Sequence, residues 1–379
     1  MFTFIMISIL ALLVGVGIYF VFFIKRFFSV FIKSKAVCYI VSVLMVASVG
    51  AGSFYLLRFG AVIILLHLFF AALLTQLIFF VLRKTLLKSR YIAENQKKNY
   101  FEVIYKLGVV PVAVTLAVAI IGHIIMVSVS QTHYTYETNK LAGGESIRVA
   151  MISDLHMGTT MNCNDLQKYM KEIEKTKPDA FFLVGDIVDE STTKEEMTEA
   201  FKIMGNVKTK DGVYYVYGNH DRNIYKNHTM FTDKELESAI TDSGIKILTD
   251  DVVEFDDYIV VGRDDYSSTT EEYSRKPIYQ LTESVDRSKY IISLDHQPRD
   301  LPDVADADVD LHFSGHTHGG QVWPVGWISD ILGVFEMTYG EKQIDNTHIV
   351  VSSGIASWGY SLRTQGKSEY VVVDIVGTK

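Results

Sequence analysis

Residues that could bind metals or transfer protons follow five predicted strands of the chain. They come after the apolar runs at 147–152, 180–184, 213–217, 290–294 and 309–314, in the order Asp154, His156, Asp186, Asn219, His220, Asp221, His296, His316 and His318. Oxygen and imidazole ligands together suit Mn, Fe, Zn or a similar divalent metal. The set contains no cysteine, which argues against a structural zinc site.

The spacing within two of these groups favours a shared site. The pairs are Asp154-Leu155-His156 and His316-Thr317-His318. Residues two apart in an extended segment point the same way, so both side chains of a pair can face one point. Neighbouring glycines let the backbone turn sharply at a strand end. A single Asp there is more often a turn residue, and a single His is more often a surface or core residue. The ordered set is therefore what predicts a metal site.

Strands and helices alternate from residue 148 onward and would position these side chains. Short apolar runs that end at glycine or at Ser-Asp are typical of buried strands. Helical spacing follows over 164–176, 194–206 and 232–243, and more strands are predicted near 245–248, 252–255, 258–262, 347–351 and 370–376. This order suggests packed sheets with helices on the outside. The polar residues 131–147 are expected to form a linker.

The first 130 residues have a different composition. Four apolar runs lie at about 3–24, 36–57, 60–82 and 107–129. A helix of such length crosses ~30 Å of hydrocarbon, so we predict four transmembrane helices. The same residues contain twelve Lys or Arg and two Glu, a net charge of +10 in a chain whose net charge is −8. The two parts of the chain are therefore expected to sit in different environments.

The loop charges indicate sidedness. Basic residues are concentrated between runs one and two and between runs three and four, whereas the loop between runs two and three has one cation, Arg58. The positive-inside rule places both basic loops in the cytoplasm. We therefore expect a multi-pass protein of the cell membrane, with everything after about residue 131 outside the cytoplasm.

Four motifs resemble those of the calcineurin-like metallophosphoesterase superfamily. They are Asp154-Leu155-His156, Gly185-Asp186-Ile187-Val188-Asp189, Gly218-Asn219-His220-Asp221 and Gly315-His316-Thr317-His318-Gly319-Gly320. The sequence looks most similar to the membrane-attached YkuE/YaeI-like branch, whose pattern continues through Gly320-Gln321-Val322-Trp323-Pro324. The resemblance covers about 148–376 and leaves out the four-helix region. It implies an α/β catalytic domain over 148–379, built as a four-layer α-β-β-α sandwich.

The resemblance also implies two divalent metal ions and a mechanism. One metal would be held by Asp154, His156, Asp186 and His318, and the other by Asp186, Asn219, His296 and His316. Asp186 would then bridge the two metals, and the motif around His296 is the least distinctive. Metal-activated hydroxide would attack a phosphoester. His220 would donate a proton to the leaving group, and Asp221 would orient His220.

The substrate is less constrained than the reaction. The bilayer is the expected partner of the helices, and a lipid phosphoester is one candidate substrate. The acidic balance after residue 130 argues against nucleic acid as a partner. Trp323, Trp358 and Tyr360 are either an apolar rim for an acyl chain or core aromatics. Arg363 is either a phosphate contact or a surface cation.

Two other functions are compatible with the same motifs. One is a catalytically silent metal-binding sensor or scaffold, against which the complete ligand set and His220 argue. The other is a regulator of a protein partner bound by the four-helix region. No particular protein partner is indicated. The apolar runs lack acidic residues and clear charged pathways, which disfavours ion transport.

Overall fold

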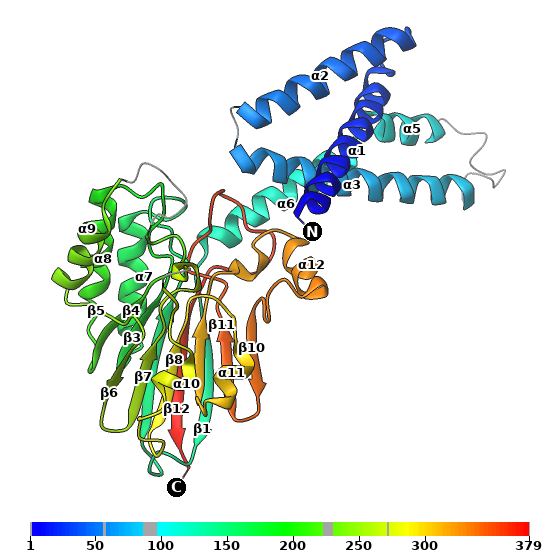
Figure 1. Cartoon of the computed structure of the whole chain (residues 1–379). Helices are drawn as coiled ribbons and strands as arrows, with labels where there is room; N and C mark the ends of the chain where they lie inside the picture. The colour runs from blue at the N-terminus through cyan, green and yellow to red at the C-terminus, as the bar shows by residue number, and fades with distance from the viewer. Residues whose placement is uncertain (1, 56–57, 86–96, 223–229, 271–272, 379) are drawn as a thin grey trace. The chain divides into compact units, whose positions relative to one another are not determined.

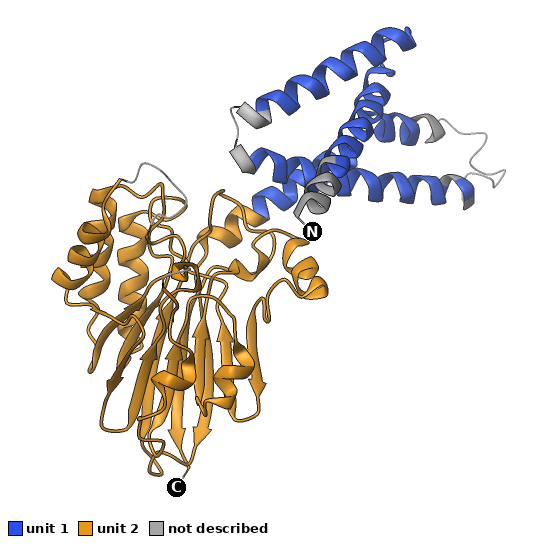
Figure 2. Ribbon diagram, in the orientation of Figure 1, with its two compact units in different colours: residues 1–121 blue, residues 122–379 orange. Residues whose placement is uncertain are grey.

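A computed structural model describes residues 2–55, 58–85, 97–222, 230–270 and 273–378 (Figure 1). The chain divides into unit 1, Met1–Ile121, and unit 2, Gly122–Lys379 (Figure 2). The helices described before residue 128 are α1 (Phe2–Phe28), α2 (Lys35–Tyr55), α3 (Arg58–Thr85), α5 (Lys97–Leu107) and α6 (Val109–Val127). Helix α6 extends across the division, and its residues from Gly122 onward belong to unit 2.

Four of these helices are long and apolar enough to cross a membrane. The spans lie at Ala11–Phe28, Lys35–Gly52, Gly60–Leu82 and Val109–Val127. Large apolar side chains face outward along them, including Leu12, Ile40 and Leu116. This is the reverse of a water-soluble helix, which turns its apolar stripe toward a core. The four predicted apolar helices are confirmed.

Unit 2 is built on two six-stranded mixed sheets. The first sheet has the order β1 (Ser130–Thr138), β12 (Glu369–Gly377), β2 (Ser146–Ile152), β3 (Ala180–Val184), β4 (Gly212–Val216) and β5 (Lys246–Ile247). The second has the order β10 (Gly340–Ile344), β11 (Thr347–Val351), β9 (Leu311–Ser314), β8 (Tyr290–Leu294), β7 (Tyr258–Gly262) and β6 (Asp251–Glu254).

Three apolar clusters show how the layers pack. Alternate residues of a strand face opposite sides, so Phe181 and Phe182 of β3 enter different clusters. Phe182 meets Phe313 of the second sheet between the two sheets. Phe181 packs under an outer helix layer made of α7 (Cys163–Lys175), α8 (Lys194–Gly205) and α9 (Asp233–Asp242). The far face of the second sheet is covered by α10 (Ile278–Leu281) and α11 (Leu301–Asp306). The predicted four-layer sandwich is confirmed.

The outer helices begin at polar caps encoded in the sequence. Thr193 of α8 accepts from the backbone of Glu196, whose side chain accepts in return. Thr232 and Glu235 form the same capping box at α9. Each box satisfies backbone N–H groups that have no partner inside the helix. These caps hold the helix layer over the first sheet.

The prediction of a linker over 131–147 is wrong for most of its length. Residues Ser130–Thr138 form β1, an edge strand that pairs in parallel with β12. Tyr134 and Tyr136 face the cluster between the sheets, whereas His133 and Thr135 are exposed. An edge strand with one wet face needs few apolar residues, so the polar composition concealed it. The polar strand β10 and the short helix α12 (Val325–Leu332) were also not predicted.

Candidate active site

The candidate ligands lie where parallel strands end. Strands β2, β3 and β4 run in parallel in one sheet, and β7, β8 and β9 do so in the other. Asp154, Asp186 and Asn219 follow the first group, and His296 and His316 follow the second. Carboxyl ends of parallel strands meet at one edge, where ligand sites of α/β proteins commonly form. All seven predicted ligands are brought together there.

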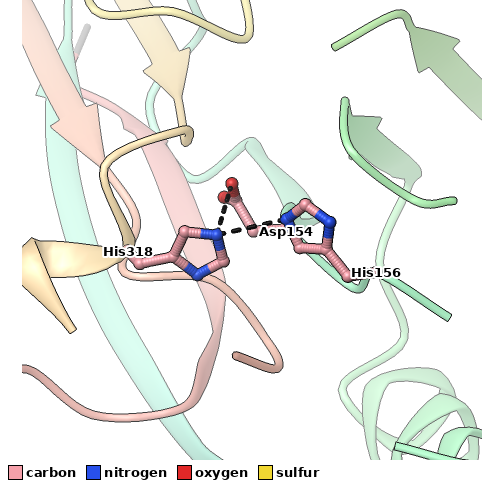
Figure 3. Close-up of side chains that lie close together, drawn as sticks. All are labelled: Asp154, His156 and His318. Carbon is pink, nitrogen blue, oxygen red and sulfur yellow. Dashed lines mark hydrogen bonds and ion pairs between the residues drawn. The ribbon is translucent and has the colours of Figure 1, made fainter. Parts of the chain in front are cut away.

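One cluster consists of Asp154, His156 and His318, whose ligand atoms lie within 4.8 Å of one another. Figure 3 shows the three side chains pointing toward a common position. His318 Nε2 lies 3.2 Å from His156 Nε2 and 3.5 Å from Asp154 Oδ1. All three residues are buried. Two imidazole nitrogens and a carboxylate converging out of water form a typical set for a divalent cation.

The second cluster consists of Asp186, His296 and His316. His296 Nε2 lies 3.1 Å from Asp186 Oδ2, and His316 Nδ1 lies 2.7 Å from Asn219 Oδ1. Asp186 Oδ2 also lies 3.7 Å from His156 Nε2, in the first cluster. Asp186 is thus the carboxylate that touches both clusters, as a bridging ligand must.

The protonation states of His316 and His318 suit metal binding. Burial lowers the pKa of His316 to about 3 and that of His318 well below its usual value. A neutral imidazole offers a lone pair, which is its metal-binding form. His296 differs, because Asp186 and Asp154 outweigh the effect of burial and raise its pKa. Its buried Nε2 faces the Asp186 carboxylate at 3.1 Å. A proton and a cation compete for that nitrogen.

The comparisons with known proteins agree with this geometry. The family model for calcineurin-like phosphoesterases matches residues 147–320. An uncharacterized metallophosphoesterase of Aquifex aeolicus is 30% identical over 253 residues, which cover 64% of this chain and 90% of the relative. The chain belongs to the calcineurin-like phosphoesterase family.

More distant relatives of the family extend the match. The uncharacterized metallophosphoesterase YkuE of Bacillus subtilis is 26% identical over 66% of this chain and 86% of its own length. A Bos taurus "transmembrane protein with metallophosphoesterase domain" is 25% identical over 59% of this chain. The chain spans 52% of that relative, and 60% and 58% of two further bacterial relatives. The predicted family resemblance is confirmed, and calcineurin-like phosphoesterases use divalent metals.

The backbone at the candidate ligands is left-handed, and not extended as predicted for the two pairs. Asp154 and His156 have φ of 54° and 43°, and His316 and His318 have φ of 71° and 51°. Asp186 is left-handed too, with φ of 53°. Such a conformation in a residue other than glycine costs about 1–3 kcal/mol and gathers at functional sites. Tight left-handed turns, and not the two-residue repeat of a strand, therefore orient the candidate ligands.

Two glycines of the family motifs make room for the ligands. Gly185 has φ of 74°, and a Cβ there would lie 2.5 Å from His296 Nδ1. A Cβ at Gly218 would collide with Asp186. Because Gly185 has no side chain, His296 Nδ1 can lie 2.9 Å from the carbonyl oxygen of Val184. With Nδ1–H donating there, Nε2 is the nitrogen that faces Asp186.

The carboxylate beside His220 is Glu190, and not the predicted Asp221. His220 Nδ1 lies 2.8 Å from Glu190 Oε1. The backbone N–H of His220 donates to Asp186 Oδ1 at 2.8 Å. Burial lowers the pKa of His220, but the hydrogen bond to Glu190 and the charge of Asp186 outweigh it and raise the pKa. Cations bound nearby would oppose that rise.

Asp221 holds the backbone of the turn that contains Asp186. Its Oδ2 accepts from the N–H groups of Asp186 and Gly218 at 2.7 and 2.6 Å. Its Oδ1 accepts from Ile187 and Val188 at 2.8 and 3.0 Å. A fully buried carboxylate with four backbone donors fixes the turn that carries Asp186. This contact pattern gives Asp221 a structural role in place of the predicted orientation of His220.

The sequence prediction missed the role of Asp189. Its Oδ2 lies 3.3 Å from His156 Nδ1. Burial would raise the pKa of Asp189, but hydrogen bonds with His156 and Ser191 lower it well below its usual range. A carboxylate on the second nitrogen of a ligand histidine fixes the ring and increases its basicity. The repeated Asp in Gly-Asp-Ile-Val-Asp was the available signal.

The remaining candidates, Arg363 and the tryptophans, differ in how far they are buried. Arg363 is fully buried, so the alternative of a surface cation is wrong. Its guanidinium donates to carbonyl oxygens that include those of Ser353 at 2.8 Å and Ala356 at 2.6 Å. Trp323 and Trp358 are 45% and 40% exposed, so they are not core aromatics. The ring of Trp358 lies 5.4 Å from that of His220, at the site.

Proposed function

We propose that this chain is a membrane-anchored phosphoesterase that hydrolyses a phosphoester at a site holding two divalent metal ions. The observation that carries the proposal is the position of Asp186, 3.7 Å from His156 and 3.1 Å from His296. One carboxylate shared by two ligand sets is the arrangement required for a pair of adjacent cations. Membership of the calcineurin-like family supports the reaction class.

The proposed ligand sets follow the two clusters. Asp154, His156 and His318 would hold one cation, and Asn219, His296 and His316 the other, with Asp186 shared. Mn, Fe and Zn suit this mixture of oxygen and nitrogen ligands. When bound, two such cations would supply an activated water and neutralise charge on the phosphoryl group.

His220 is the proposed proton donor to the leaving oxygen. Its backbone bond to Asp186 ties it to the shared ligand, and Glu190 engages Nδ1. A carboxylate on Nδ1 fixes the ring and directs proton exchange through Nε2. Glu190 is then a positioning residue for His220. Trp358, beside the His220 ring, forms one wall for the substrate.

The membrane spans support a substrate found at a membrane, and we propose a lipid phosphoester. The basic loops, with Lys25 and Arg26 at the end of α1, favour a catalytic unit on the outer side. Accessibility of a tag after residue 379 to a membrane-impermeant reagent tests this sidedness. Labelling only after the membrane is permeabilised would reverse it. A lipid extract incubated with the enzyme and resolved by mass spectrometry tests the substrate class.

The central experiment measures hydrolysis by the full chain in detergent after chelation and after Mn²⁺ is added back. Chromogenic phosphodiesters and phosphomonoesters serve as substrates. We expect Mn²⁺ to restore turnover, and His220→Asn to lower it by about 10²–10⁴-fold with metal content unchanged. Asp242→Asn, an exposed carboxylate on α9, is the matched control. A chain that holds two equivalents of metal but hydrolyses neither ester would instead be a silent metal-binding module.

A further inference from the structure

Helix α12 of unit 2 turns its large apolar side chains outward. Its buried residues are the small Gly326 and Ser329. The outward side is continuous in sequence with exposed residues on both flanks, and we call this set the α12 surface: Trp323, Val325, Trp327, Ile328, Ile331, Leu332 and Val334. Ile331 is 74% exposed and Leu332 70%. Grouped exposure of this kind marks a surface that binds a protein or a membrane.

The α12 surface is tied to the end of a membrane-spanning helix. The N–H of Gly326 donates to Gln365 Oε1 at 3.1 Å, and that of Trp323 donates to Thr364 Oγ1 at 3.0 Å. The preceding residue, Arg363, donates its N–H to the carbonyl oxygen of Gly122 in α6 at 3.2 Å. All of these residues belong to unit 2.

The contact with α6 is close and extends to the end of the helix. A Cβ at Gly122 would lie 2.8 Å from Leu362 Cδ1 and 2.9 Å from Thr364 Cγ2, so a larger residue there would displace these side chains. Beyond it, Ser368 Oγ donates to the carbonyl oxygen of Met126 at 2.7 Å, and Tyr169 Oη donates to that of Val127 at 3.1 Å. The end of α6 is therefore fixed to the catalytic unit.

The apolar span of α6 relates this attachment to the bilayer. The span in α6 ends at Val127. Gly122 lies five residues earlier, about 7.5 Å along the helix axis at 1.5 Å per residue. The segment that touches Gly122 therefore lies about 7.5 Å inside the end of the span, within the ~5–10 Å depth that interfacial helices reach. Gly326 of α12 donates a hydrogen bond to Gln365, which follows that segment in the chain.

We propose that the α12 surface docks into the lipid boundary of the bilayer that α6 spans. The partner is phospholipid itself, at the junction of headgroups and acyl chains. Apolar helix faces in this position sink about 5–10 Å into the boundary. Tryptophan favours the same zone because its ring is apolar and its N–H is polar. The three tryptophans of the chain are Trp323, Trp327 and Trp358, and two of them belong to this surface.

Tryptophan emission from the full chain tests the proposal directly. Trp323→Phe and Trp358→Phe leave Trp327 as the single reporter, and the protein is reconstituted into phosphatidylcholine vesicles. We expect lipid brominated near the headgroup end of its chains to quench Trp327 about twofold, because the ring would lie in that zone. Iodide present on both sides of the vesicle should quench it little.

A matched reporter elsewhere on unit 2 serves as the control. Tyr279 of α10 is 60% exposed, close to the 63% of Trp327. Figure 1 draws α10 well apart from α12. Tyr279→Trp, in a chain with all three native tryptophans replaced by Phe, should be quenched by iodide and unaffected by brominated lipid.

A charge variant completes the test. Ile331→Asp with Leu332→Asp should return Trp327 emission in brominated vesicles to its value in ordinary vesicles, with bound metal unchanged as the check of folding. If brominated lipid does not quench the emission of Trp327, the proposal is overturned. If iodide then quenches it, the α12 surface lies in water. If neither reagent quenches it, protein covers the surface, either the N-terminal helices or a second copy of the chain.

Discussion

The candidate ligand site and the α12 surface are two regions of unit 2 that depart in opposite ways from the usual rule of apolar side chains inside and polar side chains outside. At the site, Asp154, His156 and His296 are charged or polar and fully buried. On the α12 surface, Trp327 and Ile331 are apolar and largely exposed. Both arrangements are unfavourable for an isolated chain in water. We propose that each becomes favourable with a particular partner, which is a cation in one region and lipid in the other.

The comparison predicts that the site depends most on its shared carboxylate. Asp186→Asn keeps the shape of the side chain but removes the negative charge that touches both clusters. We expect both metals to bind weakly and turnover to fall by roughly 10⁴-fold or more, since both cations position the reacting groups. Elemental analysis and turnover measure this, with Asp242→Asn alongside. Two retained metals would show that Asp186 does not bridge.

Asp221 is predicted to affect stability more than chemistry. Asp221→Asn replaces one of the two buried carboxylate oxygens by an NH2 group, which is a donor and faces backbone N–H groups. Leaving a buried donor without its acceptor costs about 1–3 kcal/mol, so we expect a loss of about 2–4 kcal/mol in the free energy of unfolding. Chemical denaturation in detergent measures the loss. A variant of normal stability with a specific loss of turnover would return Asp221 to a catalytic role.

The sequence was informative where geometry is local and less so elsewhere. The gathering of the candidate ligands at one site could be predicted because each follows a strand in a short motif. The orienting partner of His220 could not, because Asp221 is its neighbour in sequence while Glu190 is 30 residues away and reaches it only through the fold. Strand β1 was missed because its outward side chains are polar. The α12 surface was missed because small residues, Gly326 and Ser329, occupy the buried side of the helix.

Glu190 should have a moderate and purely kinetic effect. Glu190→Gln removes the carboxylate from His220 Nδ1 at a partly exposed position. We expect turnover to fall by about 10–100-fold, as for other residues that orient a catalytic or ligand histidine, with metal content and stability unchanged. Glu190→Asp should recover part of the turnover, because a shorter carboxylate can still accept from Nδ1. Equal loss in both variants would argue against an orienting role.

The smallest effect is expected on the α12 surface. Ile331 is 74% exposed, whereas Ile291 on β8 is fully buried, so one substitution can be compared at both. In detergent, Ile331→Ser should change the free energy of unfolding by no more than about 0.5 kcal/mol. Ile291→Ser should lower it by about 3 kcal/mol or more, because it leaves a cavity and a buried hydroxyl. If the two substitutions destabilise equally, Ile331 packs against protein, and the contrast between an inward-facing site and a lipid-facing helix fails at that residue.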